Sequence, residues 1–255
     1  VVEGKSVDLG GRRIIKKKKL YSARERECFS DWLSYHQNEG DEWLRYGAGI
    51  YLKNCSFATV RSCRSTGNQN ALLMTGCNNA LVYNNFFHFN SGLGIGLYRS
   101  SKNRIMHNRV EWNVRGYSHG FYERGQDSAA ILVYEQSNEN LIAYNSGSHS
   151  GDGLFLWAGQ STMDTGKGGC NDNLIYGNDF SYAATNGIEA TFFFFYIQGN
   201  YMAECTYGIW AGYTYEWNDA QTAATRVVGG KTRSVQGQTW IYPSEGACLQ
   251  CHTAA

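Results

Sequence analysis

Two stretches of the chain concentrate side chains that can move protons or stabilise charge. Histidine, tyrosine and carboxylates serve as general acids and bases, and arginine stabilises developing negative charge. The first stretch, near residues 114–128, contains Arg115, Tyr117, His119, Tyr122, Glu123, Arg124 and Asp127. The residues that follow it are Glu135, His149, Asp152, Asp164 and Glu189. These positions are the candidates for catalysis.

Each candidate also has a structural interpretation. His119 and Arg124 could anchor a loop by hydrogen bonds, and Asp152, between two glycines, could be a turn residue. The aspartates could instead supply oxygen ligands to Ca²⁺, although no loop has an established spacing for that ion. No metal ligand set is therefore assigned.

A repeat of 22–23 residues indicates how these side chains are positioned. Short segments begin with a small residue, followed by an aliphatic, a variable position and another aliphatic or alanine, which is typical of a strand with one buried face. They begin at Gly49, Ala71, Gly94, Ala130, Gly153, Gly187 and Gly208. A second aliphatic column is formed by Val60, Val82, Ile105, Ile142, Ile175 and Ile197.

Three residues after each member of the second column lies a third column, in which asparagine predominates. It consists of Cys63, Asn85, Asn108, Asn145, Asn178 and Asn200. Asparagine tolerates left-handed backbone, and its amide can bond to the asparagine of the next coil. We interpret this column as a structural ladder.

A short period with two strands per repeat predicts an all-β fold, a single-stranded right-handed parallel β-helix of about seven coils. The two longer spacings mark insertions near residues 114–128 and 161–170, and such loops often carry function. We expect a cap segment at 1–46, which includes a short amphipathic helix after the capping box at Ser22, the β-helix at 47–212 and an irregular tail at 213–255.

Composition excludes several other classes. Lys and Arg number 23 against 22 Asp and Glu, so nothing indicates nucleic-acid binding, and no apolar run is long enough to span a bilayer. We expect a monomer. Cys55 and Cys77 occupy the same position of adjacent coils, where they could form a disulfide or pack as reduced thiols.

The repeat resembles the right-handed parallel β-helix family of secreted bacterial proteins, which includes pectate-lyase-like and mannuronan-epimerase-like members. The blocks that carry the resemblance are RGYSHG (115–120), RGQDS (124–128), GDG (151–153) and NGIEAT (186–191). The Asp-Pro-His-Asp signature of the alginate epimerases is absent. The resemblance implies a secreted or periplasmic protein that binds or processes a polysaccharide.

Such chemistry assigns roles to the candidates. In a lyase or epimerase, Arg124 would neutralise the substrate carboxylate, His119 would act as the base and Tyr122 as the acid. A hydrolase needs two carboxylates, and the available set is Asp127, Glu135, Asp152 and Glu189.

An aromatic column follows the first strands of the central coils. If the aliphatic positions point inward, Tyr98, Tyr134 and Trp157 point outward and form a ladder. An exposed ladder would stack on sugar rings, with Arg115, Asp152 and Glu189 contributing polar contacts. The alternative is that the insertions cover these rings.

The C-terminal sequence Cys248-Leu-Gln-Cys251-His252 matches the attachment motif for c-type haem. Only three residues follow it, so we expect no stably ligated haem in this chain. Two alternatives to an enzyme remain, a non-catalytic binding or structural solenoid and the carrier of a haem electron-transfer module.

Overall fold

The structure is a computed structural model of the 255-residue chain. It describes residues 47–115, 125, 128–158, 168–191 and 195–212 of the solenoid region. Beyond these it describes 215–218, 220, 222, 224–227, 229–235 and 238–242. The expected N-terminal helix, the haem motif and residues His119, Tyr122, Arg124 and Asp127 lie outside these ranges.

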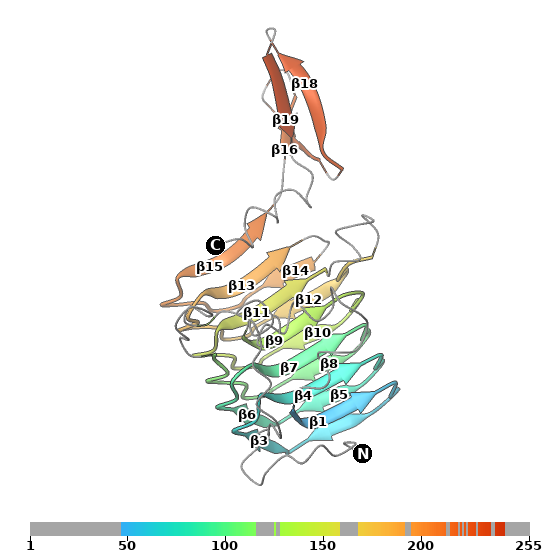
Figure 1. The fold of residues 1–255 in the computed structure, drawn as a ribbon, viewed down its shortest axis with the longest axis vertical. Helices are drawn as coiled ribbons and strands as arrows, with labels where there is room; N and C mark the ends of the chain where they lie inside the picture. The colour runs from blue at the N-terminus through green and yellow to red at the C-terminus, as the bar shows by residue number, and fades with distance from the viewer. Residues whose placement is uncertain are drawn as a thin grey trace, which may run out of the picture.

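Parallel strands wind through successive coils and stack into two long sheets (Figure 1). The first sheet has seven strands: β1 (Ala48–Lys53), β4 (Asn70–Thr75), β7 (Leu93–Tyr98), β9 (Ala129–Tyr134), β11 (Asp152–Trp157), β13 (Asn186–Thr191) and β15 (Tyr207–Gly212). The second has six: β2 (Thr59–Arg61), β5 (Leu81–Tyr83), β8 (Arg104–Met106), β10 (Leu141–Ala143), β12 (Asn173–Tyr176) and β14 (Phe195–Gln198).

A third, shorter face completes each coil. It contains the parallel pair β3 (Arg64–Thr66) and β6 (Phe86–His88), and single β-bridges extend this pairing through later coils. After the solenoid come two antiparallel hairpins, β16 (Tyr215–Trp217) with β17 (Ala224–Arg226), and β18 (Lys231–Val235) with β19 (Gln238–Tyr242). Within the described ranges, no helix has the length and apolarity that a membrane crossing requires.

The predicted aliphatic columns are confirmed as the core. Val60, Val82, Ile105, Ile142, Ile175 and Ile197 are paired in register from coil to coil. The small-residue segments pair in the same way, so that Leu72, Ile95, Ile131, Leu154 and Ile188 form a second buried stack. Identical registers let aliphatic side chains fill the narrow interior without gaps.

The asparagine ladder is also confirmed. In each step, one asparagine donates its backbone N–H and its Nδ2 to the Oδ1 of the asparagine in the next coil, as Asn108 does to Asn145 at 3.0 and 2.9 Å. The same Nδ2 reaches the Val82 carbonyl at 2.9 Å. The ladder therefore satisfies buried backbone groups at a turn where the strands end.

Cys55 and Cys77 are both free thiols. The buried Cys77 Sγ lies 3.5 Å from the Leu52 carbonyl and 3.4 Å from that of Thr75, and burial raises the pKa of this thiol. The reduced, packed alternative is the one that the structure contains.

Candidate active site

Asp152 begins β11, at the edge where the strands of the first sheet start, and only 7% of its surface is exposed. Its Oδ1 accepts three hydrogen bonds from the adjacent coil: 2.5 Å from Thr185 Oγ1, 2.9 Å from the Asn186 N–H and 3.0 Å from Asn186 Nδ2. A carboxylate with three donors on one oxygen is held in a fixed orientation.

Glu189 projects from the same coil as Asn186, three residues further along β13. Asn186 Nδ2 donates to Glu189 Oε2 at 2.9 Å, so one amide group bridges the two carboxyl groups. The sum of the two Nδ2 distances, 3.0 and 2.9 Å, is the largest possible separation of those oxygens.

Burial and mutual repulsion give the two carboxyl groups different pKa values. Burial raises the pKa of Asp152 to about 6, although its hydrogen bonds from Thr185 and Asn186 favour the ionised form. Burial, followed by the negative charge of Asp152, raises the pKa of Glu189 to about 8, against the hydrogen bond from Asn186. Near neutral pH the site therefore holds one ionised and one protonated carboxyl group.

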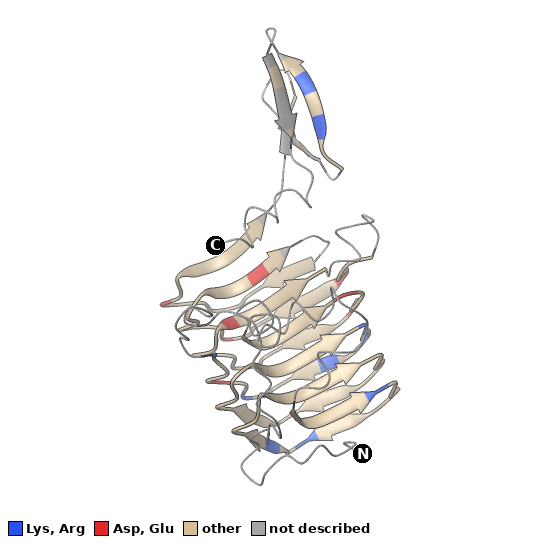
Figure 2. Ribbon diagram, viewed as in Figure 1, with Lys and Arg blue, Asp and Glu red and all other residues tan. Residues whose placement is uncertain are grey.

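Two aromatic residues of the last coil border the pair. Tyr207 is in register with Asn186, and Trp210 is in register with Glu189. Their ring centroids are 5.7 Å apart, and 58% of Tyr207 is exposed. Charged side chains are sparse along the strands of the first sheet, where β13 carries an acidic one (Figure 2). The Glu189 carboxyl group thus lies beside the aromatic residues of the last coil.

The end of the first insertion packs against this site. Gly125 has a φ of +91°, and a Cβ there would lie 2.7 Å from Ala184 Cβ and 3.4 Å from Gly151 Cα. Only glycine permits this approach. The Ser128 hydroxyl donates to the Gly125 carbonyl at 2.8 Å and holds the loop end in place.

Other predicted site residues lie elsewhere. Glu135 follows β9 at the opposite end of the first sheet, where it is buried and its Oε1 lies 2.8 Å from Arg99 Nη2. Arg115 lies near Gly92, and its backbone N–H donates to Ser128 Oγ at 3.0 Å. In the part of the chain that the structure describes, no hydrogen bond joins either residue to Asp152 or Glu189.

Tyr98, Tyr134 and Trp157 form the predicted ladder, but the prediction that the ladder is exposed is wrong. The rings do stack, with centroids 5.2 and 5.1 Å apart, but only 3%, 1% and 6% of these residues is exposed. They belong to a second apolar cluster on the outer face of the first sheet, together with Leu132 and Phe155. Both faces of this parallel sheet are buried, so its aromatic rings are packing residues.

Residues 36–165, just over half of the chain, match the family described as the right handed beta helix region. The chain belongs to the right-handed β-helix family. No curated protein and no solved structure matches this β-helix.

The β-helix contains two site residues, Asn186 and Thr185, to which sequence reasoning gave no role. Asn186 could have been found from the coil register, because it lies one coil after Asp152 in the same column. Within the described residues, no three His, Cys, Asp or Glu side chains gather closely enough to hold a metal ion.

Proposed function

We propose that this β-helix hydrolyses a polysaccharide, with Asp152 and Glu189 as its carboxylate pair. The observation that carries the proposal is the single Asn186 amide that hydrogen-bonds to both groups. It keeps one oxygen of each carboxyl group within two hydrogen-bond lengths of the other, and glycoside hydrolysis needs two such groups beside one glycosidic bond. Lysis or epimerisation of a uronate would instead use His119, Tyr122 and Arg124, which lie outside the described residues.

The two groups would divide the work by protonation state. Glu189 is half-buried and protonated at neutral pH, so it would donate a proton to the glycosidic oxygen as the bond breaks. Asp152 is ionised and would stabilise the positive charge that develops on the sugar ring. A water molecule would then add to the anomeric carbon, and its proton would return to the Glu189 carboxylate, which restores both groups. Tyr207 and Trp210 offer apolar ring surface for the sugar beside Glu189.

A polymeric sugar substrate places this activity outside the cytoplasm, in the periplasm or the medium, where the protein would act as a monomer. We propose this location together with the activity.

The test measures release of reducing ends from a panel of neutral and acidic polysaccharides, with the absorbance of 4,5-unsaturated uronates recorded in parallel. We expect reducing ends without that absorbance. Glu189→Gln should lower the rate by at least about a hundredfold, since general acid catalysis contributes roughly 10²–10⁴-fold. Glu139→Gln is the matched control, because Glu139 is exposed and forms an ion pair with the exposed Lys102 at 3.6 Å.

Equal activity of Glu189→Gln and Glu139→Gln would overturn the assignment of the acid. Unsaturated products would show elimination in place of hydrolysis. A parent protein inactive on the whole panel would favour a binding solenoid.

A further inference from the structure

Four rings form a column on the surface of the solenoid, away from the buried aromatic rings of the first sheet. Phe89, Trp112, His149 and Tyr182 come from the same turn of four successive coils. Their centroids are 6.0, 4.2 and 4.7 Å apart, and their planes are tilted by 25°, 17° and 20°. We call these four residues the ring column.

The ring column is open to solvent. Phe89 is 59% exposed, Trp112 42% and Tyr182 53%. Trp112, His149 and Tyr182 stack on one another, so these rings present mainly their outer edges to solvent. Phe89, 6.0 Å from Trp112, overlaps its neighbour less. Apolar surface of this extent on consecutive coils indicates a binding surface.

The backbone at these positions is unfavourable for bulky residues. Phe89, Trp112, His149 and Tyr182 have φ values between +55° and +59°, and the preceding coil has Gly67 there, with φ +72°. A non-glycine residue in this region costs roughly 1–2 kcal/mol. The same backbone occurs at other turns of the coils, as at Lys102, Glu139 and Tyr144, so the turn itself imposes it. Packing does not require an aromatic ring at an exposed turn, and four rings in succession point to a function.

A second column runs parallel to the rings on the third face. Bridges connect Phe86, Arg109, Ser146, Asp179 and Tyr201 from coil to coil. The two aromatic ends of this column are 43% and 63% exposed, and the members between them carry a guanidinium, a hydroxyl and a carboxylate. Apolar rings therefore lie beside hydrogen-bonding groups over the same coils, an arrangement that matches the two kinds of surface on a sugar.

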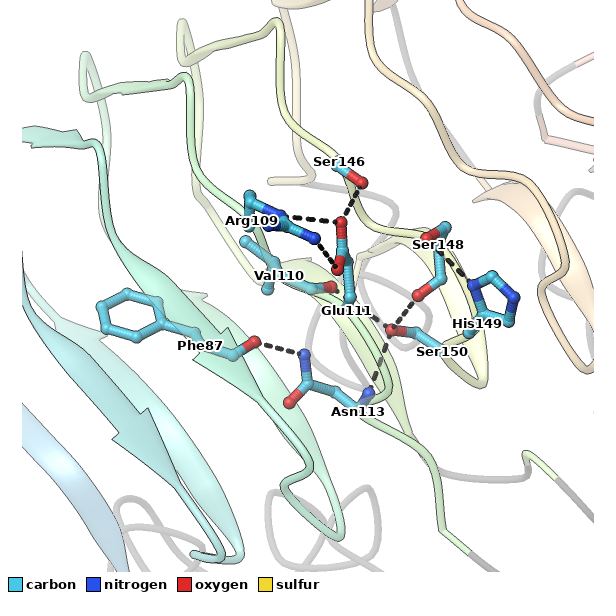
Figure 3. A network of polar contacts seen from close by, with 9 residues as sticks. All are labelled: Phe87, Arg109, Val110, Glu111, Asn113, Ser146, Ser148, His149 and Ser150. Atoms are coloured by element: carbon cyan, nitrogen blue, oxygen red, sulfur yellow. Dashed lines mark hydrogen bonds and ion pairs between the residues drawn. The ribbon is translucent and has the colours of Figure 1, made fainter.

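The charges on this face compensate one another. Glu111, next to Trp112, accepts from Arg109 Nη2 at 3.0 Å and from the Ser146 hydroxyl at 2.6 Å (Figure 3). The same view shows His149 a short way along, hydrogen-bonded to Ser148. A pair of opposite charges gives this strip no strong attraction for an acidic polymer.

We propose that the ring column and the parallel polar column bind a neutral polysaccharide chain lying along the solenoid axis. On three successive coils a ring and a polar group recur together, as Trp112 with Arg109, His149 with Ser146 and Tyr182 with Asp179. The site is independent of the carboxylate pair, since no member of either column takes part in its hydrogen bonds. It would anchor the polymer, whether or not the pair cleaves it.

The experiment is affinity electrophoresis of the intact chain in gels containing hydroxyethylcellulose, galactomannan or polygalacturonate. We expect retardation by at least one neutral polymer and none by polygalacturonate. Trp112→Gly should weaken the binding about fivefold to tenfold, the effect of losing one aromatic contact. Glycine suits this turn, as Gly67 shows, so the variant should fold.

Tyr144→Gly is the matched control. Tyr144 is 50% exposed, has φ +56° and stacks on His107, but it lies on another turn, whose next coil has Gly177 at φ +62°. This variant should bind like the parent, and Tyr182→Gly should weaken binding as Trp112→Gly does. Free migration of the parent in both neutral gels, retardation by polygalacturonate alone, or equal losses in Trp112→Gly and Tyr144→Gly would each overturn the proposal. Glu189→Gln should keep full retardation, which separates this site from the hydrolase proposal.

Discussion

Trp157 stacks on Tyr134 with ring centroids 5.1 Å apart, and the two rings are in register on neighbouring strands of the first sheet. Only 6% of Trp157 is exposed. Replacing it with alanine should therefore destabilise the protein by about 3–5 kcal/mol, the usual cost of deleting a buried large aromatic. Denaturant unfolding measures the change, and Tyr196→Ala, at a 62% exposed position, should have little effect. Similar stabilities of the two variants would contradict the burial of Trp157.

The aliphatic stack predicts a large penalty for a buried charge. Ile142 is fully buried between Ile105 and Ile175. Ile142→Asp should cost several kcal/mol, because the carboxylate must be buried without a partner or become protonated. Leu141→Asp, where the side chain points to the other face and is half-buried, should cost much less. Equal melting temperatures of Ile142→Asp and Leu141→Asp would show that Ile142 does not belong to the buried stack.

The asparagine ladder can be tested at its centre. Asn145 Oδ1 accepts the Asn108 N–H at 3.0 Å, and Asn145 Nδ2 donates to the Ile105 carbonyl at 2.9 Å. Asn145→Leu removes the buried acceptor of the Asn108 N–H and Nδ2 and should cost more than about 2 kcal/mol, since each unsatisfied group costs roughly 1–3 kcal/mol. Asn171→Leu loses one exposed contact to the Gly168 carbonyl and should cost under about 1 kcal/mol. Chemical denaturation of the two variants checks this difference.

The register of the coils could be predicted from the sequence because it depends on local periodicity. The aliphatic and asparagine columns recur every 22 or 23 residues apart from the two insertions, and they keep a constant offset of three residues from each other. Each residue needs only its equivalent in the next coil. The exposure of Tyr134 and Trp157 could not be predicted in this way. Alternation gives the face of the sheet to which a ring points, but whether another segment covers that face depends on long-range packing.

Part of the site was predictable from the same local periodicity. Asp152 and Glu189 were among the candidates, but their pairing through Asn186 depends on a coil-to-coil register across an insertion. The ring column can be recognised in the sequence by a constant spacing. Its members Phe89, Trp112, His149 and Tyr182 each stand four residues after a ladder asparagine.

The carboxylate pair makes stability depend on pH. The pKa of Glu189 is raised by folding, so the folded state binds its proton more tightly than the unfolded state does. Stability should fall as pH rises from the ordinary pKa of glutamate towards about 8, and then level off. Glu189→Gln removes this loss, so its melting temperature relative to the parent should be higher at pH 9 than at pH 5. Thermal melts across this range measure the difference, and an unchanged difference would contradict the raised pKa.

The most direct test of the central claim is a carbon-13 NMR titration of the two side-chain carboxyl carbons, assigned with Asp152→Asn and Glu189→Gln. We predict that the Asp152 carboxyl titrates with a pKa of about 6 and the Glu189 carboxyl with a pKa of about 8. In Asp152→Asn the pKa of Glu189 should fall, because the negative charge beside it is removed. If both carboxyl groups titrate near pH 4, and neither responds to the loss of the other, the pair cannot divide into an acid and an ionised partner at neutral pH.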